Sequence, residues 1–138
     1  MKGVALALAV VGLTAPALAQ TGDSDIDALM KKYVAAFNKG DVAQLAADVY
    51  DKGDAAAIKA RFDKLRSEEF GKLDVYGFKA CPVVGDKTKV EMRYAVIFTY
   101  RGTMNGDEVK LFDLVKTPAG WRIGGESDVK YDSTLSCG

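Results

Sequence analysis

The sequence predicts one small α+β domain in which three N-terminal helices pack on a four-stranded antiparallel sheet. Up to about residue 65, apolar residues recur three and four positions apart, which is typical of amphipathic helices. From residue 73 onwards the apolar residues alternate with polar ones, which is typical of half-buried strands. Because this period changes only once, and no linker or repeat interrupts the chain, we expect the helices and strands to form separate layers of one domain.

The first nineteen residues have the features of a cleavable signal peptide. Lys2 precedes an uncharged apolar run from Val4 to Leu13, and Ala17-Leu18-Ala19 supplies an A-x-A cleavage site. This apolar run is too short to span a bilayer, which requires about 20 apolar residues. We therefore expect residues 1–19 to be removed, the mature chain to begin at Gln20, and the protein to be periplasmic or secreted, with no membrane association after cleavage.

The composition excludes several classes of function. Basic and acidic residues number 19 each, and no basic run stands out, so nucleic acid is not an expected partner. The chain has no histidine, which removes the usual catalytic triads and histidine-based zinc sites. Cys81 and Cys137 are the two cysteines, and in an oxidising compartment such a pair is expected to form a disulfide. We predict that bridge, and neither a metal nor a cofactor.

The helices are bounded by capping residues. Residues 20–25 are small and polar and are expected to form a flexible leader, followed by the domain at residues 26–138. Ser24 or Asp25 is expected to cap the first helix of this domain. Gly40 is expected to end that helix in a left-handed conformation. Asp41 can cap a second, short helix, and Asp54 a third that closes at Gly71.

The strands are expected at residues 73–81, 90–101, 109–116 and 121–128. A tight turn at Val84–Lys87 separates the first two, and Pro118–Gly120 separates the last two. Asn105-Gly106 is the strongest short hairpin signal in the chain, because both residues tolerate the positive φ of a type I′ turn. It is therefore expected to join the second and third strands.

Three segments resemble the nuclear transport factor 2-like superfamily, which includes SnoaL-like proteins and ketosteroid isomerases. Tyr33–Asp41 is similar to the first helix and its exit, Gly53–Ile58 to the start of a later helix, and Ala119–Ile123 to the last strand. The resemblance implies a cystatin-like, cone-shaped α+β roll, in which a curved sheet encloses a pocket, often in a dimer. The segment from Tyr50 to Gly53 is shorter than the loop usual in this superfamily, and histidine is absent, so the resemblance supports the fold more than an activity.

A possible site follows from the strand register that the Asn105-Gly106 turn implies. Phe98 would lie opposite Asp113, and Tyr100 opposite Leu111, which places Asp113 on the apolar face of the sheet. Such a carboxylate is either a pocket acid or base with a raised pKa, or a structural residue bonded to a tyrosine or an arginine. The predicted pocket is lined by Tyr33, Phe37, Tyr94, Val96, Phe98, Tyr100, Leu111 and Trp121.

The neighbouring registers are predicted in the same way. Pairing around Gly85-Asp86 sets Val75 opposite Val96 and Leu73 opposite Phe98, and the last hairpin sets Gly125 opposite Asp113. The other face would then carry Ile97, Phe112 and Leu114, a patch that could be the seam of a homodimer.

Three functions remain open. The leading hypothesis is an exported domain that binds a small apolar ligand without catalysis, or a dimeric accessory module. The second is a cofactor-free lyase or isomerase in which Asp113 transfers a proton. The third is a protein-binding or inhibitor module, because Cys81–Gly85 is faintly similar to a hairpin of cystatins, although the glutamine of that motif is absent.

Overall fold

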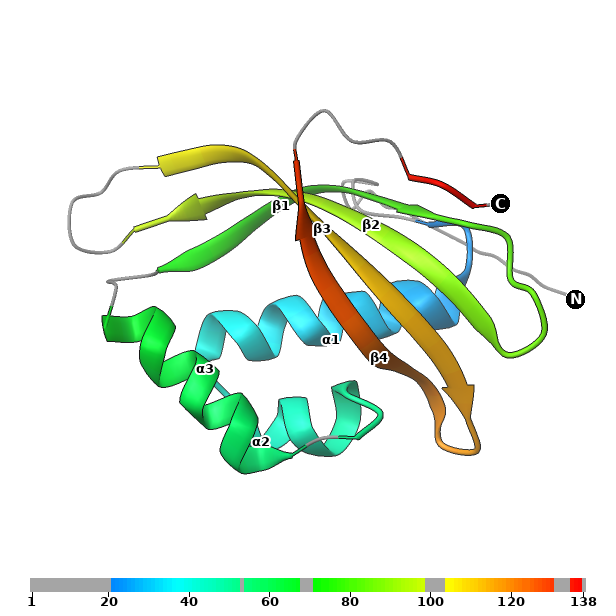
Figure 1. Cartoon of the computed structure of the whole chain (residues 1–138), viewed down its shortest axis with the longest axis horizontal. Coiled ribbons are helices and arrows are strands. Elements are labelled where there is room, and N and C mark those ends of the chain that lie inside the picture. The colour runs from blue at the N-terminus through cyan, green and yellow to red at the C-terminus, as the bar shows by residue number, and fades with distance from the viewer. Residues whose placement is uncertain (1–20, 53, 68–70, 99–103, 131–134, 138) are drawn as a thin grey trace, which may run out of the picture.

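A computed structural model of the chain describes residues 21–52, 54–67, 71–98, 104–130 and 135–137 (Figure 1). The elements are, in chain order, α1 (Ser24–Lys39), α2 (Val42–Gln44), the π-helical turn η1 (Leu45–Val49), α3 (Ala55–Ser67), β1 (Lys72–Ala80), β2 (Lys87–Ile97), β3 (Met104–Thr117) and β4 (Gly120–Val129). The strands form one antiparallel sheet in the order β1-β2-β3-β4. Three α-helices thus precede a four-stranded sheet, and the predicted fold class is confirmed. The predicted signal peptide and Tyr100 lie outside the described residues.

Short polar side chains set the helix boundaries. Asp23, rather than the predicted Ser24 or Asp25, caps α1, because its carboxylate accepts the backbone N–H groups of Asp25 and Ile26 at 2.9 and 3.1 Å. The helix therefore begins one or two residues earlier than predicted. Gly40 ends α1 with a φ of 69°, as predicted. Asp41 caps α2 through the N–H of Gln44.

The helices cover one face of the sheet. α1 lies along the concave face, and α2 and α3 lie beside it on the same side (Figure 1). This face and the helices enclose the core, which is formed by Ile26, Leu29, Met30, Tyr33, Ala36, Phe37, Leu45, Val49, Ile58, Phe62, Leu73, Phe78, Val90, Met92, Tyr94, Val96, Phe112, Leu114, Trp121 and Ile123. The amide of Asn38 ties the end of α1 to β1, because it accepts the N–H of Leu73 at 2.8 Å and donates to its C=O at 3.1 Å.

The predicted register of β2 and β3 is wrong. Asn105 lies within β3 opposite Val96, so the connection between the two strands falls before Met104. Asp113 consequently pairs with Lys89, and Phe112 pairs with Val90. The shift is an odd number of residues, which turns β3 over relative to the prediction. It buries Phe112 and Leu114 and leaves Asp113 in water, which is the more favourable arrangement because an unpaired buried carboxylate is costly.

The other two registers are closer to the prediction. Val75 lies opposite Tyr94, and Leu73 opposite Val96, each two residues from the expected partner, so the predicted faces are kept. Asp113 lies opposite Gly125, as predicted, but from Gly120 to Ile123 the register is one residue off, and an irregularity between Asp113 and Leu114 makes up the difference.

The predicted disulfide is present. Cys81 and Cys137 are bonded with a Cα–Cα distance of 5.4 Å and are 56 positions apart in the sequence. The bridge holds Leu135–Cys137 at the end of β1, on the opposite edge of the sheet from β4. Within the residues that the structure describes, no helix is long and apolar enough to cross a membrane.

Candidate functional site

A carboxylate lies on the concave face, but it belongs to Glu126 rather than Asp113. Strict alternation from Trp121 and Ile123 would send Glu126 to the outer face. The register shifts by one residue between Asp113 and Leu114, so that Gly124 is the extra residue of a bulge in β4. The bulge restores an inward direction to Glu126, which lies opposite Phe112 on the side of the helices.

Three side chains from three different elements meet the carboxylate of Glu126. The hydroxyl of Tyr50, at the end of η1, donates to Oε1. Arg61 Nη2, on α3, and Lys110 Nζ, on β3, donate to Oε2 at 3.0 and 3.1 Å. The side chains of Glu126 and Lys110 are only 11 and 15% exposed, whereas Arg61 is 51% exposed at the rim. We call Glu126, Tyr50, Arg61 and Lys110 the Glu126 cluster.

The cluster keeps Glu126 ionised. Burial alone would raise the pKa of this carboxyl group, but Lys110, the hydrogen bond from Tyr50 and Arg61 outweigh burial and hold the pKa below its usual value. The same carboxylate acts in the opposite direction on Tyr50. Burial and the negative charge of Glu126 both raise the pKa of the Tyr50 phenol, which therefore stays a hydrogen-bond donor at neutral pH.

Tyr33 lies beside this cluster with an unsatisfied hydroxyl. Its ring is fully buried and packs edge-on against Phe112 with 5.1 Å between ring centroids. Burial, together with the charge of Glu126, raises the pKa of the Tyr33 phenol well above its usual value. Among the described residues, the hydroxyl oxygen has no hydrogen-bond partner. A buried hydroxyl without a partner is costly, so the hydrogen-bonding capacity of this group is unused in the described structure.

Most of the predicted pocket residues are brought together in the core. Tyr33, Phe37, Tyr94, Val96 and Trp121 are buried in one apolar cluster, and Phe98 packs partly buried against it. Leu111 is a correction: it lies on the outer face opposite Glu91, because the register of β3 differs from the predicted one. Tyr94 shares the electrostatic environment of the site, since burial and nearby carboxylates raise the pKa of its phenol.

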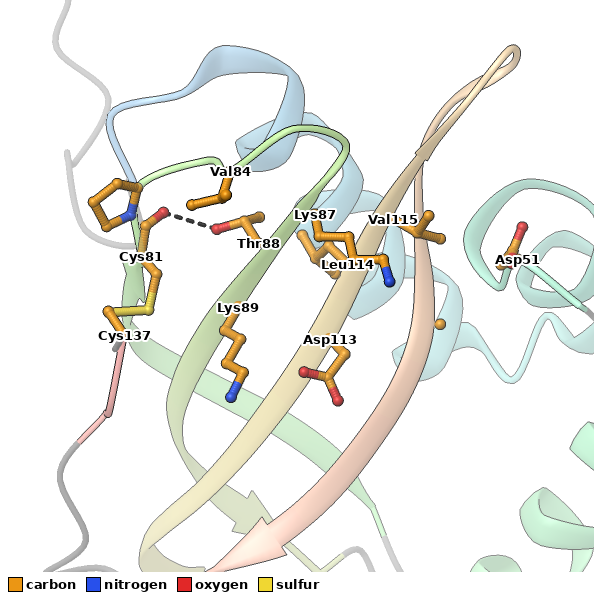
Figure 2. Close-up of a pocket in the computed structure, with 12 residues that line it drawn as sticks. Asp51, Cys81, Val84, Lys87, Thr88, Lys89, Asp113, Leu114, Val115 and Cys137 are labelled. Carbon is orange, nitrogen blue, oxygen red and sulfur yellow. Dashed lines mark hydrogen bonds between the residues drawn. A yellow bond between two sulfur atoms is a disulfide. The ribbon is translucent and has the colours of Figure 1, made fainter.

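The placement predicted for Asp113 is also wrong. The carboxylate is exposed on the outer face, away from the helices, where it projects from β3 beside Lys89 of β2 (Figure 2). Phe112 and Leu114, expected on that outer face, lie in the core instead, and of the predicted patch only Ile97 remains exposed.

Sequence reasoning missed the whole Glu126 cluster. Its members are ordinary surface-type residues spread from position 50 to position 126, and nothing in their spacing links them. The one available signal was Gly124-Gly125, since a glycine inside a strand often marks a bulge. A bulge at that point would have turned Glu126 inward.

The cluster offers hydrogen-bonding groups and a single carboxylate, Glu126, which is not by itself a set of metal ligands. Its only carboxylate is already engaged by two cations and a phenol. Across the part of the chain that the structure describes, no three His, Cys, Asp or Glu side chains are placed to hold a metal ion.

Comparison with known proteins identifies the fold. No protein-family profile and no curated protein matches the chain. Solved structures do. A nuclear transport factor 2-like protein with a cystatin-like fold from Novosphingobium aromaticivorans is 21% identical, with a TM-score of 0.61 over 82% of this chain and 84% of that one. A candidate ketosteroid isomerase from Shewanella frigidimarina is 19% identical, with a TM-score of 0.57 over 80% of this chain and 100% of that one.

A nuclear transport factor 2-like protein from Cytophaga hutchinsonii is 12% identical, with a TM-score of 0.55 over 80% of this chain and 99% of that one. At these identities the likeness concerns the fold. The chain therefore has the nuclear transport factor 2-like, cystatin-like fold that the sequence resemblance implied.

Proposed function

We propose that this protein is an exported domain that binds a small, mainly apolar ligand without transforming it, between the concave face of the sheet and α1 and α3. The observation that carries the proposal is the buried Tyr33 hydroxyl, which has no partner in the described structure and lies beside the Glu126 cluster. The ligand would accept a hydrogen bond from this hydroxyl and place its apolar part against the surrounding aromatic side chains.

The edge of the site offers a way in. A hollow of about 200 Å³ is bordered by Tyr50, Ile58 and Arg61, so it reaches the cluster from the side of α3. Arg61 is half exposed there and is the cluster member that can move most readily into water. A ligand would enter past this side chain.

The electrostatics favour binding over proton transfer. A general base works best with a pKa near the working pH and with a free oxygen to receive the proton. Glu126 has neither property, because two cations and a phenol occupy its oxygens and hold its pKa low. The alternative of an isomerase or lyase that uses Asp113 stays a prediction, but Asp113 lies on the other face of the sheet from the proposed ligand.

Export and dimer formation are further parts of the proposal. The disulfide supports an oxidising destination, because such bonds persist outside the reducing cytosol. A homodimer stays a prediction from the fold resemblance, and its seam would have to use residues other than Phe112 and Leu114, which are buried.

The test is native mass spectrometry of the protein recovered from the exporting cell, comparing the wild type with Tyr33→Phe. The wild type is expected to carry a small bound molecule, and Tyr33→Phe to lose most of it while melting at the same or a slightly higher temperature. Tyr76→Phe is the matched control, because Tyr76 is 44% exposed on β1 and should retain the ligand. Equal retention by Tyr33→Phe, or an empty wild-type protein, would overturn the proposal.

A further inference from the structure

The outer face of the sheet carries a second hollow, separate from the Glu126 cluster. Its volume is about 530 Å³, within the range of about 300–1,000 Å³ that is usual for small-molecule sites. The floor is formed by β2 and β3, and α1 lies behind the sheet in the view of Figure 2. The hollow is lined by Asp51, Cys81, Pro82, Val84, Lys87, Thr88, Lys89, Asp113, Leu114, Val115, Gly124 and Cys137.

A disulfide and hydrogen bonds hold the two walls of the hollow in place. On one side, the Cys81–Cys137 disulfide fastens the C-terminal segment to β1. The buried hydroxyl of Thr88 donates to the Cys81 carbonyl at 2.8 Å and fixes the start of β2 to the same point. On the other side, the N–H of Asp51 donates to the carbonyl of Ile123 at 2.9 Å. The shape of the hollow is therefore set by the fold and does not depend on a ligand.

Glycine keeps the hollow open beside Asp113. A Cβ on Gly124 would lie 3.7 Å from Val115 Cγ1, and a Cβ on Gly125 would lie 3.5 Å from Asp113 Oδ2. Both distances are ordinary contacts, so larger side chains are sterically possible there. They would fill the space over β4 next to the carboxylate.

The charges in the hollow balance. Lys87 and Lys89 extend from β2, while Asp113 extends from β3 and Asp51 from the far rim (Figure 2). Among the described residues, none of these four side chains has a salt-bridge partner. A ligand that carries only a positive or only a negative charge would lie beside a residue of the same charge. A ligand with both signs would pair with both, while Val84, Val115 and the disulfide offer apolar surface between them.

We propose that this hollow binds a short apolar peptide with free termini. The terminal carboxylate binds Lys87 and Lys89, the terminal ammonium binds Asp113, and the apolar side chains lie against Val84 and Val115. The volume accommodates a chain of two or three residues, each of which adds about 3.3–3.6 Å to an extended peptide. This site is independent of the ligand proposed for the Glu126 cluster.

The test is isothermal titration calorimetry of the disulfide-bonded protein with L-leucyl-L-leucine. N-acetyl-leucyl-leucine lacks the ammonium group, and leucyl-leucine amide lacks the carboxylate. Each blocked peptide is expected to bind about fivefold to tenfold more weakly than the free dipeptide, because each leaves one charged group of the site unpaired.

Variants locate the site. Lys89→Met and Asp113→Asn should each weaken the free dipeptide about fivefold or more, and Gly124→Leu should abolish binding by filling the hollow. Lys72→Met removes an exposed lysine of β1 outside the hollow and should leave binding unchanged, as should Tyr33→Phe, whose effect is confined to the other site. Circular dichroism confirms that each variant is folded. The proposal would be overturned if about 10 mM dipeptide gave no heat of binding, or if the blocked peptides bound as tightly as the free dipeptide. It would also be overturned if Lys89→Met and Lys72→Met bound the dipeptide equally well.

Discussion

Replacing Glu126 with glutamine tests the account of the concave face most directly. The substitution keeps the shape of the side chain and one oxygen, which can still accept from Tyr50, but it removes the negative charge. Lys110 then loses its buried ionic partner, while Arg61 at the rim can turn to water. A hydrogen bond to a charged group contributes about 1.5–3 kcal/mol, and a half-exposed ion pair contributes little.

From these contributions we expect Glu126→Gln to lower the free energy of unfolding by about 2 kcal/mol at pH 7, nearly all of it from Lys110. In a domain of this size that is a fall in melting temperature of about 8 °C. The measurement is urea and thermal unfolding of the disulfide-bonded chain, followed by circular dichroism.

Asp128→Asn is the matched control. Asp128 is on β4, as Glu126 is, and its Oδ1 lies 3.6 Å from Lys110 Nζ, but its side chain is 79% exposed. Its removal should change stability by less than about 0.5 kcal/mol. If Glu126→Gln costs no more than Asp128→Asn, burial of the carboxylate contributes nothing and the reasoning is refuted.

The pH dependence provides a second check. The pKa of Glu126 is lower in the folded chain than in the unfolded one, where it is about 4.3. Its stabilising contribution is therefore complete above that value and is lost as the pH falls through the folded pKa. The stability difference between wild type and Glu126→Gln should accordingly shrink below about pH 4. A difference that stays constant down to pH 2 would contradict the assigned ionisation.

Three further outcomes are expected. Replacing Cys81 and Cys137 with serine should reduce the free energy of unfolding by about 4 kcal/mol, because the bridge closes a long loop, and denaturant titration of the two forms measures the loss. Asn38→Ala should cost about 2 kcal/mol in the same assay, since it removes both hydrogen bonds between α1 and β1, whereas the exposed Lys39→Ala should cost little. Intact-mass measurement of exported protein should find Gln20 as the first residue, and retention of the preceding nineteen residues would contradict the signal-peptide assignment.

Local patterns in the sequence determined the fold class. Helical and strand periods, together with capping by short polar residues and by Gly40, act within a few residues of one another, so they can be recognised without the fold. The disulfide followed from a count of two cysteines. The short turn between β3 and β4 was also recognised, but the register that it implied is one residue off from Gly120 to Ile123, and Gly125 lies opposite Asp113 only because the bulge at Gly124 restores the predicted pairing.

The tertiary structure alone decided which side chains form the site. The Asn105-Gly106 signal pointed to a turn, yet burial of Phe112 and Leu114 against the helices outweighed that local preference and placed Asn105 inside β3. Asp113 moved to the outer face as a consequence.

The bulge at Gly124 also moved a carboxylate to the other face of the sheet, in this case from the outer face to the concave one. One extra residue in β4 turned Glu126 toward the helices, where it meets Tyr50 from η1, Arg61 from α3 and Lys110 from β3. A change of one residue in register reverses the face of every side chain beyond it, and only the packing of the whole domain selects among registers that local preferences leave nearly equal.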